Sequence, residues 1–255
     1  MELKVIAIAR NGHTDKFGIP RQSREESPIL TRIVFEPEYN VREALRGIEG
    51  YSHLWLIWGF SEVPSDKVPS DKVQSDKVPS TKEWSPTVRP PRLGGNKRMG
   101  VFATRSPFRP NPIGLSSVKN LTPALSSREG VYIGESGRIE LIVSGADVLD
   151  GTPIYDIKPY LSFSDSHPEA QNGFAEETKN RTFQVVYDPG VAYDLPPMRI
   201  RNYPEAEILY ILSQDPRPGY HDDPERLYKL DYDGWRVEFC VEGEVVVVKK
   251  IEKIT

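Results

Sequence analysis

The sequence predicts a mainly β protein, in which short strands form a barrel and a small α+β unit follows. Apolar and polar residues alternate in many short stretches, whereas helical spacing is rare. The 23 prolines and 19 glycines favour frequent turns between such strands. With 255 residues and 38% hydrophobic residues, the chain can bury one large core, or one medium and one small core.

The N-terminal part is expected to supply most of the strands. Alternation predicts them at Leu3–Ala9, Ile29–Phe35, Met99–Arg105, Leu115–Leu121 and Arg138–Val148. The aromatic run Tyr51–Phe60 predicts a further strand that is buried on both faces. Apolar spacing over Glu38–Ile48 predicts one short helix that ends near Gly47. The pair Asp150–Gly151 predicts a tight turn between strands.

The C-terminal part is expected to be a separate, smaller domain. Ser162–Lys179 is polar and acidic, and it predicts a link between a domain over residues 1–164 and one over 180–255. The predicted elements of the second domain are strands at Arg181–Asp188 and Glu207–Ser213, a helix around Met198–Ala206, and a final hairpin of Trp235–Val241 with Glu244–Ile251. Residues 63–80 repeat the motif VPSDK, and this low-complexity insert is too polar to join a core.

The composition argues against several classes of protein. A single cysteine, Cys240, excludes an intrachain disulfide framework and a cysteine zinc cluster. The four histidines are scattered, so no metal site is expected. No strand–GxGxxG–helix unit is present, which argues against a Rossmann fold. No apolar run is long enough to cross a membrane and the N-terminus is unlike a signal peptide, so a cytoplasmic location is expected.

The stretch Thr87–Ser117, called the basic stretch below, is the most unusual part of the sequence. No Asp or Glu occurs from Trp84 through Arg128, although the whole chain carries a net charge of −4. Its prolines fix φ, and its glycines allow tight turns or close approach of a ligand. The alternative is a solvated linker, but linkers do not contain strand-like alternation. We therefore expect the basic stretch to form a site for an anionic partner.

Several motifs resemble one family. They are FGIPRQ at 17–22, YSHLWL at 51–56, the basic stretch, DVLDGTPIYDIKPYL at 147–161 and QDPRPGY at 214–220. Together they resemble the TrmO/YaeB family, also called TsaA-like proteins, over nearly the whole chain except the insert. The resemblance implies an S-adenosylmethionine-dependent methyltransferase that acts on N6 of threonylcarbamoyladenosine at tRNA position 37. It also implies a single TsaA-like β-barrel in place of a Rossmann fold, and homodimers with the cofactor bound near the interface.

The resemblance also implies a set of cofactor-binding residues. Carried over by position, they are Pro20, Arg21, Gln22, Ser61, Glu62, Arg105, Leu115, Asp147, Val148, Leu149 and Asp150. A carboxylate such as Asp147 can accept hydrogen bonds from amino or hydroxyl groups of the cofactor, and Arg21 or Arg105 can bind its carboxylate. Two alternatives stay open: Asp150 can serve the turn alone, and the arginines can form surface ion pairs. Ser61–Glu62 departs from the His-Gln pair of close family members, which leaves those side-chain contacts open.

The substrate side of the site is less defined by the sequence. Arg92, Lys97 and Arg98 are predicted to contact the anticodon arm of tRNA, because their basic stretch has no acidic residue. Asp215 and Tyr220 are weak candidates for holding the reacting amine, and the alternative is a turn stiffened by proline. No general base is assigned. The rival functions are a non-catalytic RNA-binding module and a methyltransferase that acts on a small molecule.

Overall fold

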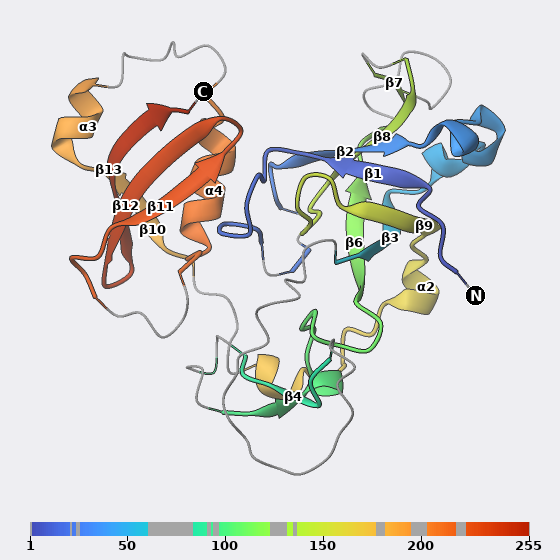
Figure 1. Ribbon diagram of the computed structural model, residues 1–255, viewed down its shortest axis with the longest axis horizontal. Helices are drawn as coiled ribbons and strands as arrows, with labels where there is room; N and C mark the ends of the chain where they lie inside the picture. The colour runs from blue at the N-terminus through green and yellow to red at the C-terminus, as the bar shows by residue number, and fades with distance from the viewer. Residues whose placement is uncertain are drawn as a thin grey trace.

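The computed structural model describes residues 2–20, 22–23, 26–60, 84–90, 93, 97–122, 132–134, 137–176, 182–194, 203–217 and 223–254. Two β-sheets lie side by side, a large one from the N-terminal part and a small one from the C-terminal part (Figure 1). A two-stranded ribbon, β4 (Thr87–Val88) with β5 (Met99–Gly100), lies below the large sheet in the same view. The mainly β fold class is confirmed.

The large sheet is antiparallel throughout. Its strands are β1 (Ala7–Arg10), β2 (Leu30–Phe35), β3 (His53–Gly59), β6 (Ile113–Asn120), β7 (Tyr132–Ile133), β8 (Ile139–Ser144) and β9 (Pro153–Pro159). Their order is β2-β1-β9-β3-β6-β8-β7, and β2 also pairs with β8. Six of the strands therefore have a hydrogen-bonded neighbour on each side. The predicted strands at Ile29–Phe35, Leu115–Leu121 and Arg138–Val148 correspond to β2, β6 and β8.

The first core lies on the inner face of the large sheet. In β3, Leu54, Leu56 and Trp58 are buried, whereas Trp55 and Ile57 stay partly exposed on the other face. The prediction that this strand is buried on both faces is therefore wrong. The physical reason is that an antiparallel sheet can leave one face to solvent, and aromatic side chains tolerate a half-exposed position there.

Three further predictions in the N-terminal part need correction. The helix expected over Glu38–Ile48 is replaced by the 3-10 helices η1 (Pro37–Tyr39), η2 (Arg42–Leu45) and η3 (Ile48–Gly50). Gly47 interrupts this region because its φ of 90° is left-handed. The strand expected over Met99–Arg105 shortens to β5, and η5 (Val101–Ala103) follows it. The turn at Gly151 is present, with φ of 81°, but β9 pairs with β1 and β3 rather than with β8.

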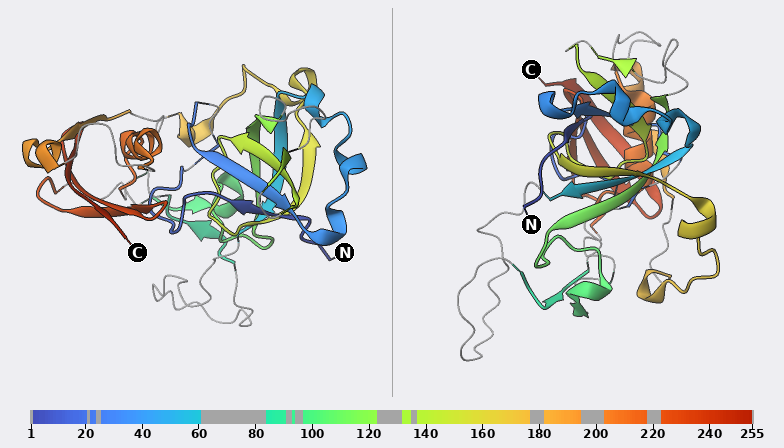
Figure 2. Two further views of the ribbon diagram at one scale, coloured as in Figure 1. Left: turned by 90° about the horizontal axis from the view of Figure 1, so that it is seen from above. Right: turned by 90° about the vertical axis from the view of Figure 1, so that its right-hand side faces the viewer.

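The small sheet has the order β10-β13-β12-β11. Its strands are β10 (Gln184–Tyr187), β11 (Tyr228–Tyr232), β12 (Trp235–Glu242) and β13 (Val245–Lys253), and helices α3 (Pro189–Asp194) and α4 (Glu205–Ser213) lie on one of its faces (Figure 2). The predicted strand β10 and the predicted final hairpin of β12 and β13 are confirmed. Sequence reasoning missed β11 and α3. In the chain between β9 and β10, the described part of the predicted link contains α2 (Ser162–Asp165) and η6 (Gly173–Ala175).

The strand predicted at Glu207–Ser213 is wrong, because this segment belongs to helix α4. Ile208, Ile211 and Leu212 are buried, and their i, i+3, i+4 spacing forms one face of a helix that packs on the small sheet. The apolar run ILYIL fits either period when it is viewed in isolation. The insert at 63–80 and residues 198–202 of the predicted helix around Met198–Ala206 lie outside the described residues.

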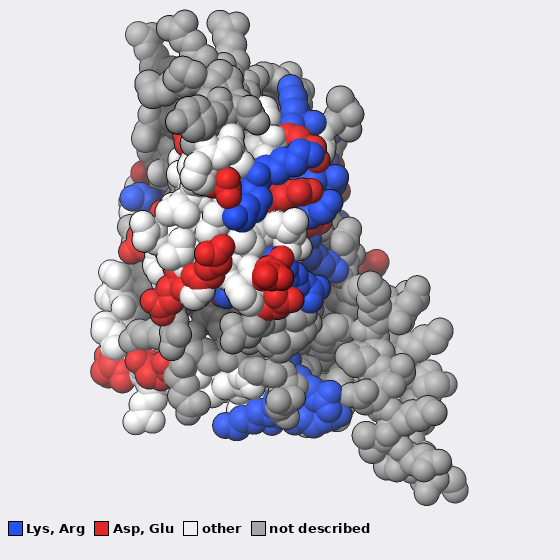
Figure 3. All heavy atoms as spheres, turned by 90° about the vertical axis from the view of Figure 1, so that its left-hand side faces the viewer, with Lys and Arg blue, Asp and Glu red and all other residues white. Residues whose placement is uncertain are grey.

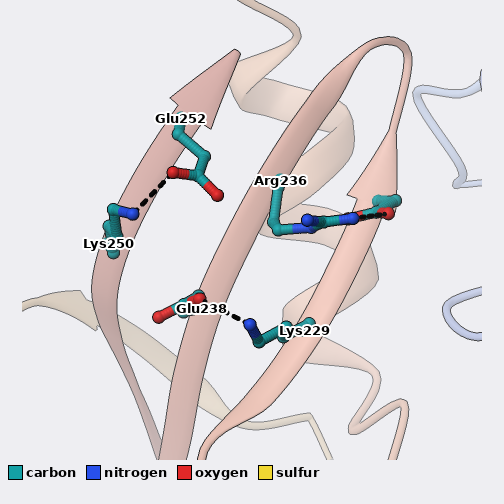
Figure 4. Close-up of polar contacts among 6 residues, drawn as sticks. Lys229, Arg236, Glu238, Lys250 and Glu252 are labelled. Atoms are coloured by element: carbon teal, nitrogen blue, oxygen red, sulfur yellow. Dashed lines mark hydrogen bonds and ion pairs between the residues drawn. The ribbon is translucent and has the colours of Figure 1, made fainter. Parts of the chain in front are cut away.

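The outer face of the small sheet carries charges in cross-strand register. Glu238 lies directly opposite Lys229 on one side and Lys250 on the other. The ion pairs are Lys229–Glu238 at 3.0 Å, Arg236–Asp231 at 2.7 Å and Lys250–Glu252 at 2.5 Å (Figure 4). Three cations and three anions therefore alternate, and the face has no net charge from these six residues. Opposite charges in register favour this strand pairing over a shifted one.

The loop between β1 and β2 joins the two parts of the molecule. Phe17 packs against the second core, which consists of buried residues of the small sheet and α4, and Ile29 belongs to that core. The backbone N–H of Asp233, at the tip of the β11–β12 hairpin, donates to Gly12 O at 2.9 Å. His13 lies in the same contact, with its ring centroid 5.1 Å from that of Tyr232. The two sheets are thus connected by packing as well as by the chain.

His13 gives this junction a pH dependence. Only 1% of His13 is exposed, and burial lowers its pKa from 6.5 to about 4. Since the unfolded chain then binds more protons than the native protein between pH 6.5 and 4, the free energy of unfolding should fall across this window as the pH is lowered. Between pH 6.5 and 4, the free energy of unfolding is expected to fall by about 3 kcal/mol. Chemical denaturation of the wild type and His13→Phe at several pH values tests this, and identical pH slopes would contradict it.

Candidate functional site

Two of the residues predicted to bind the cofactor, Leu115 and Asp147, lie close together at the start of β6. Asp147 follows β8, and its carboxylate accepts a short hydrogen bond from Ser116 Oγ on β6. Ser116 Oγ in turn accepts a hydrogen bond from Trp58 Nε1 on β3 at 2.8 Å. Ser116 is only 1% exposed and Trp58 is buried, so this chain of contacts fixes the carboxylate in one position.

The loop after Pro20 closes over the same place. Ser23 Oγ donates a short hydrogen bond to Ser117 O on β6, and the backbone N–H of Ser23 donates to the carboxylate of Asp147. Segment 22–23 is thus held against β6, beside Asp147. Sequence reasoning missed Ser23 and Ser116, because serines in loops and strands carry no signal of their own.

Opposing effects act on the pKa of Asp147 in this cluster. Burial raises the pKa of Asp147, and the hydrogen bonds from Ser116 and Ser23 together with the positive charge of Arg105 oppose that rise. Arg105 itself is exposed. A fixed carboxylate within electrostatic range of an exposed guanidinium can receive both ends of a zwitterion, because the carboxylate accepts from an ammonium or hydroxyl group and the arginine binds a carboxylate.

The start of β6 is shaped by close backbone packing. A Cβ at Gly114 would lie 2.2 Å from Trp58 Cε2, so only glycine fits there. The next residue, Leu115, is 55% exposed and offers an apolar surface. Val148 is buried, and its carbonyl accepts a hydrogen bond from Asn11 Nδ2 at 3.0 Å. Arg21, Ser61, Glu62, Arg92 and Tyr220 lie outside the described residues.

Asp150 has different partners from Asp147. Its carboxylate accepts from Arg10 Nη1 at 3.2 Å and from the backbone N–H of Asn11 at 3.0 Å. It also lines a cavity of about 570 Å³ between the large sheet and the C-terminal part, together with residues such as Glu207 and Tyr232. These contacts tie the turn at Asp150 to the end of β1, and they favour the alternative in which the Asp150 side chain stabilises its turn.

The basic stretch presents exposed cations. Lys97 and Arg98 are both exposed, and Arg98 Nη1 donates to Thr87 Oγ1 at 3.1 Å. Arg109 instead braces the loop, since its Nη1 donates to Thr104 O at 3.1 Å and to Ser106 O at 3.2 Å. Figure 3 shows a group of basic side chains at the lower edge of the molecule. This group is separate from the small sheet, on whose face basic and acidic side chains alternate.

An apolar group accompanies these cations. Phe102 is 73% exposed and Trp84 is 48% exposed, and their nearly parallel rings have centroids 6.4 Å apart. Large exposed apolar side chains of this kind mark an interaction surface more often than a solvated one. Sequence reasoning assigned neither residue.

Asp215 belongs to the C-terminal part and follows α4. Its carboxylate accepts two hydrogen bonds from Arg217, from Nε at 2.7 Å and from Nη2 at 3.1 Å. Its φ of 47° is left-handed, as in a tight turn. These contacts favour the alternative of a braced turn over a role in holding the reacting amine.

Among the described residues, no group of three or more His, Cys, Asp or Glu could hold a metal ion, and no described helix is long and apolar enough to cross a membrane.

A fixed carboxylate within electrostatic range of an arginine suits a small zwitterionic ligand, and a separate basic surface suits a polyanion. Comparison with known proteins identifies the family. The model of the tRNA-methyltransferase O N-terminal domain matches residues 8–166, and that of the TrmO C-terminal domain matches residues 181–254. The chain therefore belongs to the TrmO family, which confirms the resemblance found in the sequence.

Relatives match along most of the chain. The tRNA (adenine(37)-N6)-methyltransferase of Escherichia coli K12 is 36% identical over 246 residues, which covers 96% of this chain and 93% of the relative. The enzyme of the same name from Eikenella corrodens is 44% identical over 168 residues, covering 66% of this chain and 87% of that one. The crystal structure of TrmO from Pseudomonas aeruginosa is similar with a TM-score of 0.70 at 25% identity, covering 99% of this chain and 98% of that one.

Proposed function

We propose that this protein is an S-adenosylmethionine-dependent methyltransferase that methylates N6 of threonylcarbamoyladenosine at position 37 of tRNA. The observation that supports this most directly is the Asp147 cluster, which lies where the family resemblance puts the cofactor. Family membership over both matched regions and the name of the Escherichia coli relative support the same reaction.

The cofactor site is proposed to lie between loop 20–23, the start of β6 and segment 147–150. Asp147 accepts a hydrogen bond from the ligand, Arg105 binds its carboxylate, and main-chain groups near Leu115 contact the adenine edge. The proposed contacts also include Pro20, Arg21, Gln22, Ser61, Glu62, Val148, Leu149 and the main chain of Asp150. The residues present fit such a ligand, since Asp147 is hydrogen-bonded next to exposed Leu115 and lies within electrostatic range of Arg105.

S-adenosylmethionine supplies an electrophilic methyl group, which an amine nitrogen takes by in-line displacement. The protein's contribution is to hold the two reactants in line and to exclude water, which accounts for most of such a rate enhancement. A proton must leave the amine. Asp215 is bound by Arg217, and the description does not extend to Tyr220, so neither is given this role.

The RNA is proposed to contact Arg92, Lys97 and Arg98 through phosphates of the anticodon arm. A chain with net charge −4 needs a local positive surface to attract RNA. The outer face of the small sheet is a poor alternative, because its cations alternate with anions in register (Figure 4).

Several finer features of the assembly are part of the same proposal. The ring of six strands is proposed to be a single closed barrel in a domain over residues 1–164, with a second domain over 180–255, as the two separate cores suggest. Exposed Phe102 and Leu115 support a homodimer with the cofactor near the interface. A cytoplasmic location follows from the proposed substrate.

Transfer of a labelled methyl group from S-adenosylmethionine to bulk tRNA tests this function. Label in tRNA supports the proposal. A non-catalytic RNA-binding module would bind tRNA without label transfer. A small-molecule methyltransferase would label nucleosides or metabolites and be indifferent to tRNA.

A further inference from the structure

The loop that carries Pro20 and Gln22 is anchored on the C-terminal part before it reaches the cofactor site. The Phe17 ring lies parallel to that of Tyr228, with an angle of 7° and centroids 6.4 Å apart. It also lies 6.3 Å from the ring of Phe239 on β12. After the loop, Ile29 is 1% exposed within the second core. Both ends of the segment therefore pack on the C-terminal part, although the segment belongs to the large sheet by sequence.

Gly18 allows the main chain of the loop to lie in close contact with the second core. Its φ is +97°, and an added Cβ would lie 2.4 Å from Leu230 Cδ1 on β11 and 3.1 Å from Ile211 Cγ2 on α4. The main chain at Gly18 is thus pressed directly onto β11 and α4. Any other residue would have to move the loop away from the C-terminal part, or displace these side chains.

The other end of the same short segment is bound to the cofactor site. Ser23 donates to Ser117 O through its hydroxyl and to the Asp147 carboxylate through its backbone N–H. Only residues 19–22 separate Gly18 from Ser23, a connection that can span no more than about 18 Å. A shift at Phe17 or Gly18 therefore has only four residues in which to be absorbed before it reaches Ser23.

We propose that Phe17 is a positioning residue for cofactor binding, through which the C-terminal part holds residues 22–23 against β6, beside Asp147. The role of the C-terminal part is then to complete the cofactor site as well as to enlarge the protein. This inference rests on the proposed cofactor site. It does not require Phe17 to touch the cofactor.

Calorimetric titration with S-adenosylmethionine tests the proposal in the full chain. Phe17→Ala should raise the Kd about tenfold, the range expected when a contact of this size orders a loop. It should also raise KM for the cofactor while kcat at saturating cofactor changes little. Phe17→Tyr should restore the affinity, because it keeps the ring. The matched control is Phe163→Ala, which removes a ring that is 87% exposed on α2.

Two further variants separate the inference from the function beneath it. Asp147→Asn perturbs the site directly, and Gly18→Ala moves the loop without removing a ring, so it should weaken cofactor binding as Phe17→Ala does. Asp147→Asn alone can weaken cofactor binding, while folded Phe17→Ala and Gly18→Ala leave it unchanged. In that case the positioning role of Phe17 is wrong, whereas the proposed cofactor site is supported. If none of the three changes the Kd, the cofactor site lies elsewhere and the inference fails with it. Should Phe17→Ala not fold, Phe17→Leu is titrated in its place and judged by the same Kd.

Discussion

Asp147→Asn is expected to raise the KM for S-adenosylmethionine about 10- to 100-fold, because a hydrogen bond to a charged group contributes about 1.5–3 kcal/mol. The amide presents NH2 where the carboxylate presents an oxygen, so either Ser116 Oγ or the Ser23 N–H also loses its acceptor. Steady-state kinetics at saturating tRNA measures this change.

The control for this variant is Asp156→Asn. Asp156 lies on β9, where its half-exposed side chain pairs with Lys158, and exposed pairs contribute little. Cofactor affinity of the wild type should also fall as the pH is lowered through the pKa of Asp147, which burial raises above its ordinary value. Asp147→Asn should lack this pH dependence. An unchanged KM in the folded variant would remove Asp147 from the cofactor site.

The second large effect concerns the basic stretch. Changing Arg92, Lys97 and Arg98 together to alanine should raise the KM for tRNA and leave the Kd for S-adenosylmethionine unchanged. Each phosphate contact that is lost reduces the slope of log K against log salt by about 0.7–0.9, so the slope should flatten by about 2–3 if all three residues contact phosphates. Filter binding of tRNA across a salt series measures the slope.

A matched triple variant controls for net charge. Lys158, Lys229 and Lys250 are exposed lysines that each pair with a neighbouring acid outside the basic stretch. Changing these three to alanine removes the same total charge and should leave tRNA affinity and its salt slope nearly intact. Equal losses in both triple variants would mean that overall charge, and not this surface, attracts the RNA.

Most strands of the large sheet could be predicted because one of their faces is buried and the other is not. Alternation in β2 and β6 follows directly from that environment, whereas all six residues of β8 are buried. In α4, by contrast, the run ILYIL matches a strand and a helix equally well by sequence. The choice is made by tertiary packing, since Ile208, Ile211 and Leu212 cover the small sheet together only as a helix.

The candidate site was only partly predictable for a similar reason. The motif at 147–150 and Arg105 could be assigned from the resemblance, but their supporting contacts join distant residues. Trp58 and Ser116 meet because β3 and β6 pair in a register that puts Trp58 opposite Gly114. The docking of Phe17 on the C-terminal part depends on the shape of a second core, which neither composition nor periodicity encodes locally.

The central claim is that this chain methylates N6 of the modified adenosine at tRNA position 37. The most direct test incubates the purified protein with S-adenosylmethionine and tRNA from a strain that lacks the gene, and then analyses the digested nucleosides by mass spectrometry. The account predicts that threonylcarbamoyladenosine gains the mass of one methyl group and that the other nucleosides stay unchanged. Unchanged threonylcarbamoyladenosine in the presence of folded, cofactor-binding protein, or methylation at another nucleoside, would contradict it.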